Sequence, residues 1–291
     1  MKRLFLLSLF AALALTPLAA QNTDSLALLR GPWQQETLAP GIVWRQVQFQ
    51  QKELFGSNQC LQLIVVAPGA GIFGVAAEPL LTVTSELAEK NAALAAVNGS
   101  FFKFNYEYNT EDYNSVDYIR VNSQRLADNT YSATGQRQMH QKSALAILDG
   151  ELYIVKASPE KGWEKYIYSQ DVMVSGPLLG IDGRFEILNE DSFALTRHPR
   201  TAIGRCADGT VLLLTVDGRR SEVEGMSLRE LQRVLSWLGA KDMINLDGGG
   251  STTMYIRDKG VVNYPSDNRL FDHEGSRKVA NAVIVGMKNE K

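Results

Sequence analysis

The sequence has few of the residues that build metal and redox sites. Its 291 residues include only three histidines and two cysteines. The histidines, at 140, 198 and 273, have no metal-ligand spacing with one another, and no CxxC pair occurs. We therefore expect no structural zinc site, no metal in the active site and no cofactor. A divalent ion held by carboxylates is the minor alternative.

The two cysteines do not decide the redox chemistry of the chain. Cys60 and Cys206 both lie in short apolar runs that are typical of strands. In an exported protein two such residues can form a disulfide, and they can equally remain as buried free thiols. The sequence leaves both alternatives open.

A strong excess of either charge is also absent. Lysine and arginine number 30 against 32 aspartates and glutamates, and loss of Lys2 and Arg3 with a signal peptide would leave a net charge of −4. A nucleic-acid-binding protein would show a basic face, so we expect no nucleic-acid partner. A local pocket of arginines is still compatible with this balance.

Long apolar runs are missing beyond the first twenty residues, where "MKRLFLLSLFAALALTPLAA" combines a basic start, an apolar run and small residues at its end. This pattern is typical of a secretory signal peptide. No other run approaches the roughly 20 residues that cross a bilayer. We predict a signal peptide over residues 1–20 and a single domain over 21–291. This domain would be periplasmic or secreted and monomeric.

Short strand-like segments dominate the rest of the chain, and two helices stand out. The helices are expected over 84–93 and 227–239; the second begins with Ser227 and Glu230 at capping-box spacing and ends at Gly239. The fold class is therefore α+β, with a mixed β-sheet core and packed helices. The expected strands fall in 61–67, 92–97, 144–154, 201–216, 243–246, 253–256 and 282–286.

Five Asp-Gly pairs divide into two groups. The pairs that begin at Asp149, Asp182 and Asp208 each lie between two apolar runs, which is a strong hairpin signal. The pairs at Asp217 and Asp247 follow an apolar strand but lead into polar sequence. Sites are commonly built at such strand ends, so these two carboxylates are candidates for chemistry.

Two familiar nucleotide and hydrolase motifs can be set aside. "GAGIFG" at 69–74 matches the dinucleotide fingerprint, but Pro79 interrupts the helix that the fingerprint needs. "GGGST" at 248–252 contains a candidate nucleophile, Ser251, but lacks the GxSxG elbow. A serine-nucleophile hydrolase therefore remains an alternative only.

Several weak motifs become specific when they are taken together. They are "NGSFF" (98–102), "SGPLL" (175–179), "PRTAIG" (199–204), "TVDGR" (215–219), "NLDGGGSTTM" (245–254), "NYPSD" (263–267) and "VANAVIVG" (279–286). In this order they resemble the phosphodiester glycosidase family, over a core of about 92–288. The resemblance implies a surface cavity lined by these motifs and cleavage of a sugar C1–oxygen bond to phosphate.

The candidate site combines acids for catalysis with donors for a phosphate. Glycoside hydrolysis usually uses two carboxylates, and Asp247 and Asp217 are the predicted pair. The forked guanidinium of Arg200 suits a phosphate, and three glycines could let backbone N–H groups form an anion-binding nest. The predicted binding residues are Asn98, Gly99, Ser175, Gly176, Arg200, Thr201, Arg219, Asn245, Gly248, Gly249, Gly250, Ser251, Thr252 and Thr253.

The expected reaction is hydrolysis of a sugar-1-phosphodiester of the GlcNAc type, giving free sugar and a phosphomonoester. The partner is then a small glycan or glycophosphate. A non-catalytic glycan-binding protein is the main alternative outside the enzymes, with Tyr106, Tyr108 and Tyr113 as stacking platforms.

Export makes the first testable prediction. The N-terminus of exported protein should lie within one or two residues of Gln21, because the small residues Ala19 and Ala20 end the apolar run. N-terminal sequencing of secreted or periplasmic material checks this. Intact Met1 on exported soluble protein would contradict it.

Overall fold

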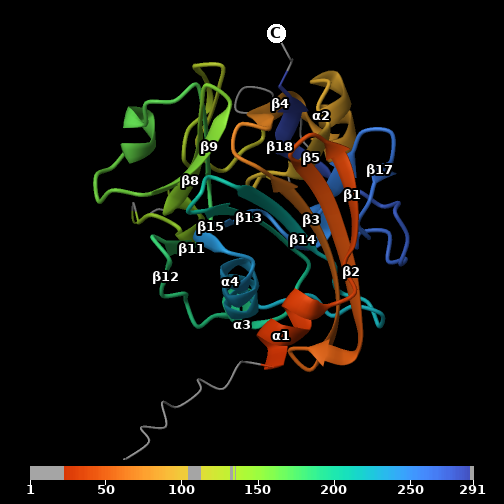
Figure 1. The fold of residues 1–291 in the computed structure, drawn as a ribbon. Coiled ribbons are helices and arrows are strands. Elements are labelled where there is room, and N and C mark those ends of the chain that lie inside the picture. The colour runs from red at the N-terminus through yellow and green to blue at the C-terminus, as the bar shows by residue number, and fades with distance from the viewer. Residues whose placement is uncertain (1–22, 104–112, 132–133, 135, 289–291) are drawn as a thin grey trace, which may run out of the picture.

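The computed structural model describes residues 23–103, 113–131, 134 and 136–288. The predicted signal peptide lies outside these residues, as do Tyr106 and Tyr108. Figure 1 shows a body built mainly of strands, with α1 and α4 at one end and α2 at the other.

Three sheets make up this body. The largest has eight strands in the order β1 (Gln34–Ala39), β2 (Ile42–Leu54), β3 (Ser57–Val66), β14 (Val211–Val216), β13 (Arg200–Cys206), β15 (Ala240–Asn245), β11 (Leu178–Ile181) and β12 (Arg184–Phe185). A second has the order β7 (Gln124–Ala127), β6 (Ile119–Val121), β10 (Asp171–Ser175), β8 (Ser143–Leu148) and β9 (Glu151–Lys156). The third has the order β17 (Gly260–Val261), β16 (Met254–Ile256), β5 (Ala95–Asn98), β18 (Lys278–Met287) and β4 (Gly71–Val83).

The expected mixed sheet is wrong in one respect. Every strand pair in the described part of the chain is antiparallel. Parallel neighbours need long crossover connections, which are usually helical, whereas antiparallel neighbours can be joined by short turns. The described part of the chain has few helices, and three Asp-Gly turns join neighbouring strands, so its local signals agree with the antiparallel arrangement.

The helices are few and mostly short. They are α1 (Thr23–Arg30), α2 (Thr84–Lys90), α3 (Ser192–Leu195) and α4 (Leu228–Trp237), with 3-10 turns η1 (Met139–Gln141), η2 (Trp163–Tyr166) and η3 (Gly249–Ser251). The predicted capping box of α4 is confirmed: Glu230 N donates to Ser227 Oγ, and Ser227 N donates to Glu230 Oε2 at 2.8 Å. Gly239, with φ of 103°, follows the end of this helix.

The eight-stranded sheet has an apolar layer on each face. On one face Leu61 and Leu214 pack with Leu28 of α1 and with Leu231 and Leu235 of α4. These helices cover the sheet at the lower end of the view in Figure 1. The other face packs against the two five-stranded sheets through a larger cluster that includes Ile64, Ile203, Val97, Leu145 and Val283. Because the three sheets share this cluster, the ends of their strands can lie close together at one edge of the molecule.

The predictions made from local turn signals were confirmed. The Asp-Gly pairs at Asp149, Asp182 and Asp208 connect β8 to β9, β11 to β12 and β13 to β14, as predicted. "GAGIFG" leads into strand β4 and not into a helix, which agrees with its rejection as a nucleotide motif.

Cys60 and Cys206 are both free thiols, which resolves the alternative that the sequence left open.

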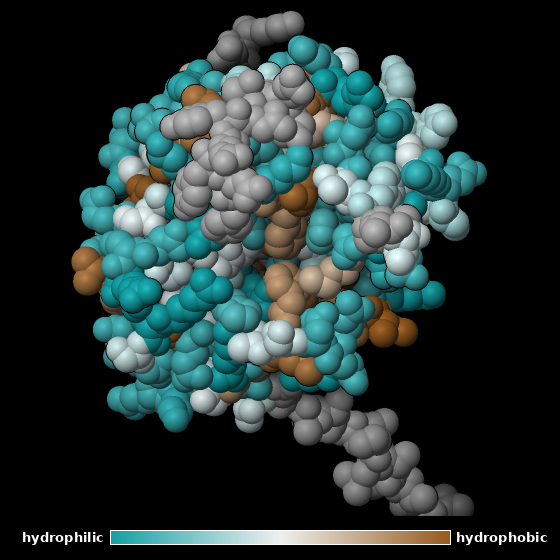
Figure 2. All heavy atoms as spheres, turned by 180° about the vertical axis from the view of Figure 1, so that it is seen from behind, coloured by the Kyte–Doolittle hydropathy of each residue, from teal (hydrophilic) through white to brown (hydrophobic). Residues whose placement is uncertain are grey.

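The face in Figure 2, opposite to that in Figure 1, is mainly hydrophilic, with apolar side chains gathered in a strip near its middle. Among the described helices, none combines the length and the apolar character that crossing a bilayer requires.

Candidate active site

Asn98, at the end of β5, joins three of the sequence motifs. Its Nδ2 donates to the carbonyl of Asp247 at 2.7 Å. Its Oδ1 accepts from Thr201 Oγ1 at 2.6 Å and from Thr253 N at 3.1 Å. The side chain is fully buried, so these bonds replace all of its contact with water. The predicted residues at 98, 201, 247 and 253 are therefore brought together.

The three glycines of the 248–250 turn are needed because the protein itself crowds them. Gly249 has φ of 61°, and a Cβ there would lie 2.9 Å from Arg219 Nη2. A Cβ on Gly248 would lie 2.7 Å from the carbonyl of Pro199, and one on Gly250 would overlap the Asp267 carboxylate. Alanine would strain all three positions.

Three of the four N–H groups of the predicted anion-binding nest are already hydrogen-bonded within the protein. Gly248 N donates to Asp247 Oδ1 at 2.9 Å, Gly249 N to the carbonyl of Pro199 at 2.9 Å, and Ser251 N to that of Gly248 at 3.2 Å. These N–H groups close the turn, so they are not left for a phosphate. Close packing inside the protein explains the glycines better than close approach of a substrate.

Asp247 stands at the end of β15 and is half-buried. Burial raises its pKa from 3.8 to about 6, although the Ser251 hydroxyl, the Gly248 amide and the positive charges of Arg277 and His140 act in the opposite direction. A carboxyl that titrates near neutral pH suits acid–base work. Among the described contacts none joins Ser251 to a histidine, so the structure adds no support to a serine nucleophile.

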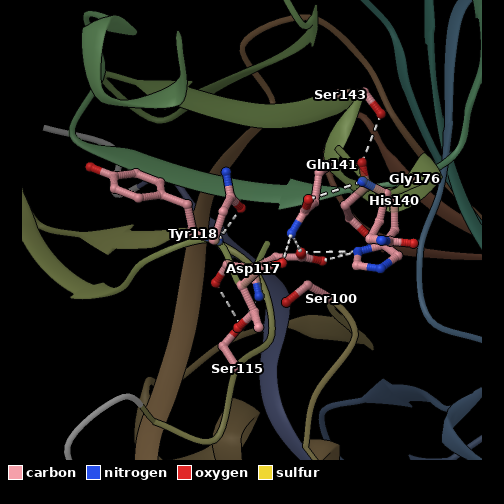
Figure 3. Close-up of polar contacts among 12 residues, drawn as sticks. Ser100, Ser115, Asp117, Tyr118, His140, Gln141, Ser143 and Gly176 are labelled. Atoms are coloured by element: carbon pink, nitrogen blue, oxygen red, sulfur yellow. Dashed lines mark hydrogen bonds and ion pairs between the residues drawn. The ribbon is translucent and has the colours of Figure 1, made fainter. Parts of the chain in front are cut away.

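His140 and Asp117 form a pair that the sequence reading did not identify. His140 Nδ1 lies 2.8 and 2.9 Å from the two Asp117 carboxylate oxygens, and Gln141 Nε2 donates to Asp117 Oδ1 at 3.1 Å. Figure 3 shows these side chains converging. Asp117 is fully buried, and burial raises its pKa in spite of its contact with His140.

The geometry of this pair leaves one side of the imidazole ring available. An ionised Asp117 holds the proton on Nδ1, so Nε2 is the nitrogen that can meet a substrate. The ring of Phe101 packs beside His140, with centroids 5.1 Å apart. Asp247 N donates to the carbonyl of Gly99 at 3.0 Å, two residues before Phe101, and the charge of His140 lowers the pKa of Asp247, so the two groups are coupled electrostatically.

Asp217, the second predicted carboxylate, lies deeper in the protein. It is 1% exposed, and its Oδ1 accepts from Asn263 Nδ2 and Tyr264 N, each at 2.9 Å. Burial raises its pKa to about 6, although these two hydrogen bonds favour the charged form. Asn263 Nδ2 also donates to the carbonyl of Thr252 at 3.0 Å. Asp217 thus reaches the Asp247 turn through Asn263.

Arg200 is not placed as an open phosphate clamp. It is 1% exposed, and Nε donates to the carbonyl of Met226 at 2.9 Å. Nη2 donates to the carbonyls of Phe193 at 2.6 Å and Thr196 at 3.0 Å. Burial and the nearby charge of Arg219 lower the pKa of Arg200 to about 10. Its main contacts stabilise the loop before β13.

The remaining predicted residues are of two kinds. Some hold the segments of the site in place, and others have buried polar atoms without a hydrogen-bond partner. Gly99 is a support, because a Cβ there would overlap Asn281 Oδ1. The segment at Ser175 and Gly176 has the same role, because the carbonyl of Gly176 accepts from Asn245 Nδ2 at 2.9 Å. Buried polar atoms normally have partners, so those without one indicate where ligand or water binds. Within the described residues such atoms include Asn245 Oδ1, Thr252 Oγ1 and Thr253 Oγ1, whereas Asp217 also has a side-chain contact with the Cys60 thiol.

A metal site does not emerge from the described side chains. In that part of the chain no three His, Cys, Asp or Glu residues are grouped as ligands. The expectation of a reaction without metal or cofactor therefore stays a prediction.

Comparison with known proteins gives the family. The sequence pattern of the phosphodiester glycosidase family matches residues 91–286. N-acetylglucosamine-1-phosphodiester alpha-N-acetylglucosaminidase of Mus musculus is 38% identical over 76 residues, which are 26% of this chain and 14% of that protein. The same enzyme of Bos taurus is 41% identical over 69 residues, 24% of this chain and 13% of that protein. The chain therefore matches about one seventh of the length of these relatives.

A solved structure shows the same fold over most of the chain. The catalytic domain of the zebrafish N-acetylglucosamine-1-phosphodiester alpha-N-acetylglucosaminidase, auto-inhibited by its pro-peptide, superposes with a TM-score of 0.66 at 17% identity. The match covers 92% of this chain and 94% of that one. The family pattern places the chain in the class of hydrolases that act on glycosyl bonds. The chain belongs to the phosphodiester glycosidase family.

The buried carboxyl of Asp217 makes a prediction about stability. Its folded pKa of about 6 exceeds the ordinary 3.8, so the folded state binds this proton more tightly than the unfolded state. The resulting stability is complete below pH 4 and is lost as pH rises through about 6. The loss is about 3 kcal/mol at most. Asp217→Asn keeps the Oδ1 acceptor and should melt higher than the wild type at pH 7.

Thermal melts at pH 4.5 and pH 7.5 test this expectation. The difference between the melting temperatures of variant and wild type should be larger at pH 7.5. Asp208→Asn is the control, because Asp208 is exposed and its pKa is lowered by Thr210 instead of raised by burial. A lower melting temperature for Asp217→Asn at pH 7.5 would show that the charge stabilises the fold.

Proposed function

We propose that this protein hydrolyses the glycosidic bond of a sugar-1-phosphodiester, with GlcNAc as the sugar, and releases free sugar and a phosphomonoester. The observation that carries the proposal is the half-buried Asp247, whose pKa is raised to about 6, within electrostatic range of the His140–Asp117 pair. Family membership and the names of the mammalian relatives support the choice of bond and sugar.

Asp247 acts on the sugar side of the scissile bond. Water oxygen bonds to C1, the C1–oxygen bond to phosphate breaks, and the bonding pair leaves with the phosphate. The carboxylate either takes the proton from water or attacks C1 first, and both roles need its ionised form. The amide of Gly248 at 2.9 Å holds Oδ1, which fixes the direction of the carboxylate.

His140 acts on the phosphate side. A phosphomonoester is a weakly basic leaving group, so it needs charge neutralisation more than full protonation. An imidazolium whose Nδ1 proton is held by Asp117 can donate from Nε2 to the departing oxygen. Asp117 is a positioning residue, because it acts by fixing the ring and stabilising its charged form.

Arg219 replaces Arg200 as the phosphate ligand in this proposal. Its guanidinium lies over Gly249 in the Asp247 turn, whereas that of Arg200 is committed to backbone carbonyls. A planar guanidinium can pair with two phosphate oxygens.

We also propose that the mature protein works outside the cytoplasm. The composition of residues 1–20 is that of a signal peptide, and no described helix is suited to span a membrane. Its substrate would then be an extracytoplasmic glycophosphate.

Removal of the Asp247 charge should stop the chemistry. Asp247→Asn keeps the acceptor for Gly248 N but loses the ionised carboxylate, so kcat should fall by roughly 10² or more. Because the carboxylate must be ionised, kcat/KM of the wild type should decline as pH falls through about 6. Release of free GlcNAc from methyl-phospho-GlcNAc measures both effects.

The matched control is Asp182→Asn, which makes the same change in the Asp-Gly turn between β11 and β12. It should retain wild-type kcat and the same pH profile. Full turnover by Asp247→Asn would move the catalytic carboxylate to Asp217 and leave the 247–253 turn as a binding loop.

The His140–Asp117 pair makes a separate prediction. His140→Ala should lower kcat by about 10²-fold or more, because the group that neutralises the leaving phosphate is lost. Added imidazole should restore part of this activity. Asp117→Asn should lower kcat more than it raises KM, since it disturbs the ring without removing it.

His198→Ala serves as the comparison variant, because the backbone of His198 pairs with that of Met226 and alanine keeps this pairing. Its activity should not respond to added imidazole. Wild-type kcat in folded His140→Ala protein would remove His140 from the mechanism.

A further inference from the structure

A cavity of about 460 Å³ lies beside the candidate active site. Part of its wall is apolar and comes from Pro177, Leu178, Leu188 and Leu228. The volume is large enough for a group well beyond a single phosphate, since ligand pockets usually measure a few hundred cubic ångströms. Neither Asp247 nor Asp217 belongs to its lining, so it is a separate compartment.

The polar part of the lining is strongly cationic. Arg137, Lys142, Lys156 and Lys161 all face the cavity, and among the described residues that line it Glu186 is the one acid. Lys156 pairs with Glu186 at 2.5 Å, so the remaining three positive charges have no carboxylate of the lining to balance them. Such an excess favours an anionic ligand.

Arg137 is held in place without losing its charge. Its Nη1 donates to the carbonyl of Ser158 at 2.7 Å and its Nη2 to that of Glu160 at 2.8 Å. Its guanidinium also lies 5.9 Å from the centre of the Trp163 ring. Backbone carbonyls fix the group but carry no full negative charge, so a prepositioned cation is offered to the cavity.

The cavity and the active site share a wall. Met139 lines the cavity, and His140 is the next residue along η1. A Cβ on Gly176 would lie 3.0 Å from the carbonyl of Met139 and 3.1 Å from Cα of His140, so the 176–177 segment packs directly against them. Figure 3 shows Gly176 beside His140. Pro177 continues this segment into the cavity lining.

We propose that this cavity binds the part of the substrate beyond the scissile phosphate, and that this part carries a second acidic group next to an apolar or aromatic portion. The inference rests on the proposed function, which places the leaving phosphate at His140. An uncharged sugar would gain little from three cations. A leaving group that extends from the phosphate at His140 into the cavity would place a second anionic group close to Arg137 and Lys142. The substrate class is therefore a sugar-1-phosphate ester with an anionic leaving group.

Two substrates with the same sugar test the proposal. Methyl-phospho-GlcNAc has a neutral methyl group beyond the phosphate, whereas UDP-GlcNAc has a second phosphate, a ribose and a base. The wild type should show a kcat/KM at least tenfold higher on UDP-GlcNAc. Arg137→Gln combined with Lys142→Gln should lower kcat/KM on UDP-GlcNAc by about tenfold or more, mainly through KM. Hydrolysis of methyl-phospho-GlcNAc should not change.

Lys90→Gln is the matched control, because Lys90 lies on α2 and pairs with Glu78, outside the cavity. It should leave both substrates unaffected. An equal preference for the two substrates in the wild type, or the same preference in wild type and double variant, would overturn the proposal.

Binding of UDP separates this inference from the proposed function. Calorimetric titration should give binding to the wild type and a Kd at least tenfold weaker in the double variant, with no need for turnover. Failure to cleave either substrate would contradict the proposed function, and UDP binding that depends on Arg137 and Lys142 would still support the anionic subsite. Absence of UDP binding to the wild type would overturn the subsite itself.

Discussion

The buried amide of Asn98 is the interaction on which the candidate site depends. Its three hydrogen bonds connect the end of β5 to Asp247, Thr201 and Thr253, which come from distant parts of the chain. Backbone and side-chain donors at a rim of three sheets would otherwise be buried without partners, at a cost of about 1–3 kcal/mol each. The amide donates from Nδ2 and accepts at Oδ1, whereas an ionised carboxylate only accepts and a hydroxyl must do both from one oxygen, so neither has the same separated donor and acceptor.

The candidate site also contains two carboxyls, Asp217 and Asp247, whose charged forms are disfavoured by burial. Burial raises the pKa values of both Asp217 and Asp247 to about 6, so their ionised forms cost stability at neutral pH. Asp117 is also buried, but His140 provides a direct partner at 2.8 Å. A fold selected for stability alone would replace such carboxyls. Buried carboxyls with raised pKa values are the groups that acid–base chemistry uses, so the energetic cost agrees with the proposed function.

Local features of the sequence predicted much of the fold, and contacts between distant segments account for the rest. The capping box of α4 and the three Asp-Gly hairpins were confirmed because each is decided within a few residues. The polar strands β1 and β2 were missed because their pairing with β3 supplies the order that their composition does not indicate. His140 and Asp117 were missed as a pair because they lie 23 residues apart in irregular segments.

The run of three glycines shows how a correct motif can carry a wrong physical reason. The sequence suggested a backbone that comes close to a substrate, whereas Pro199, Arg219 and Asp267 occupy the space beside these residues. Bulky neighbours on all sides force the turn into one shape, with Gly249 at positive φ. That shape directs the Asp247 carboxylate and brings the Arg219 guanidinium over the turn. The glycines thus let other side chains approach the turn, and several neighbours depend on that space at once.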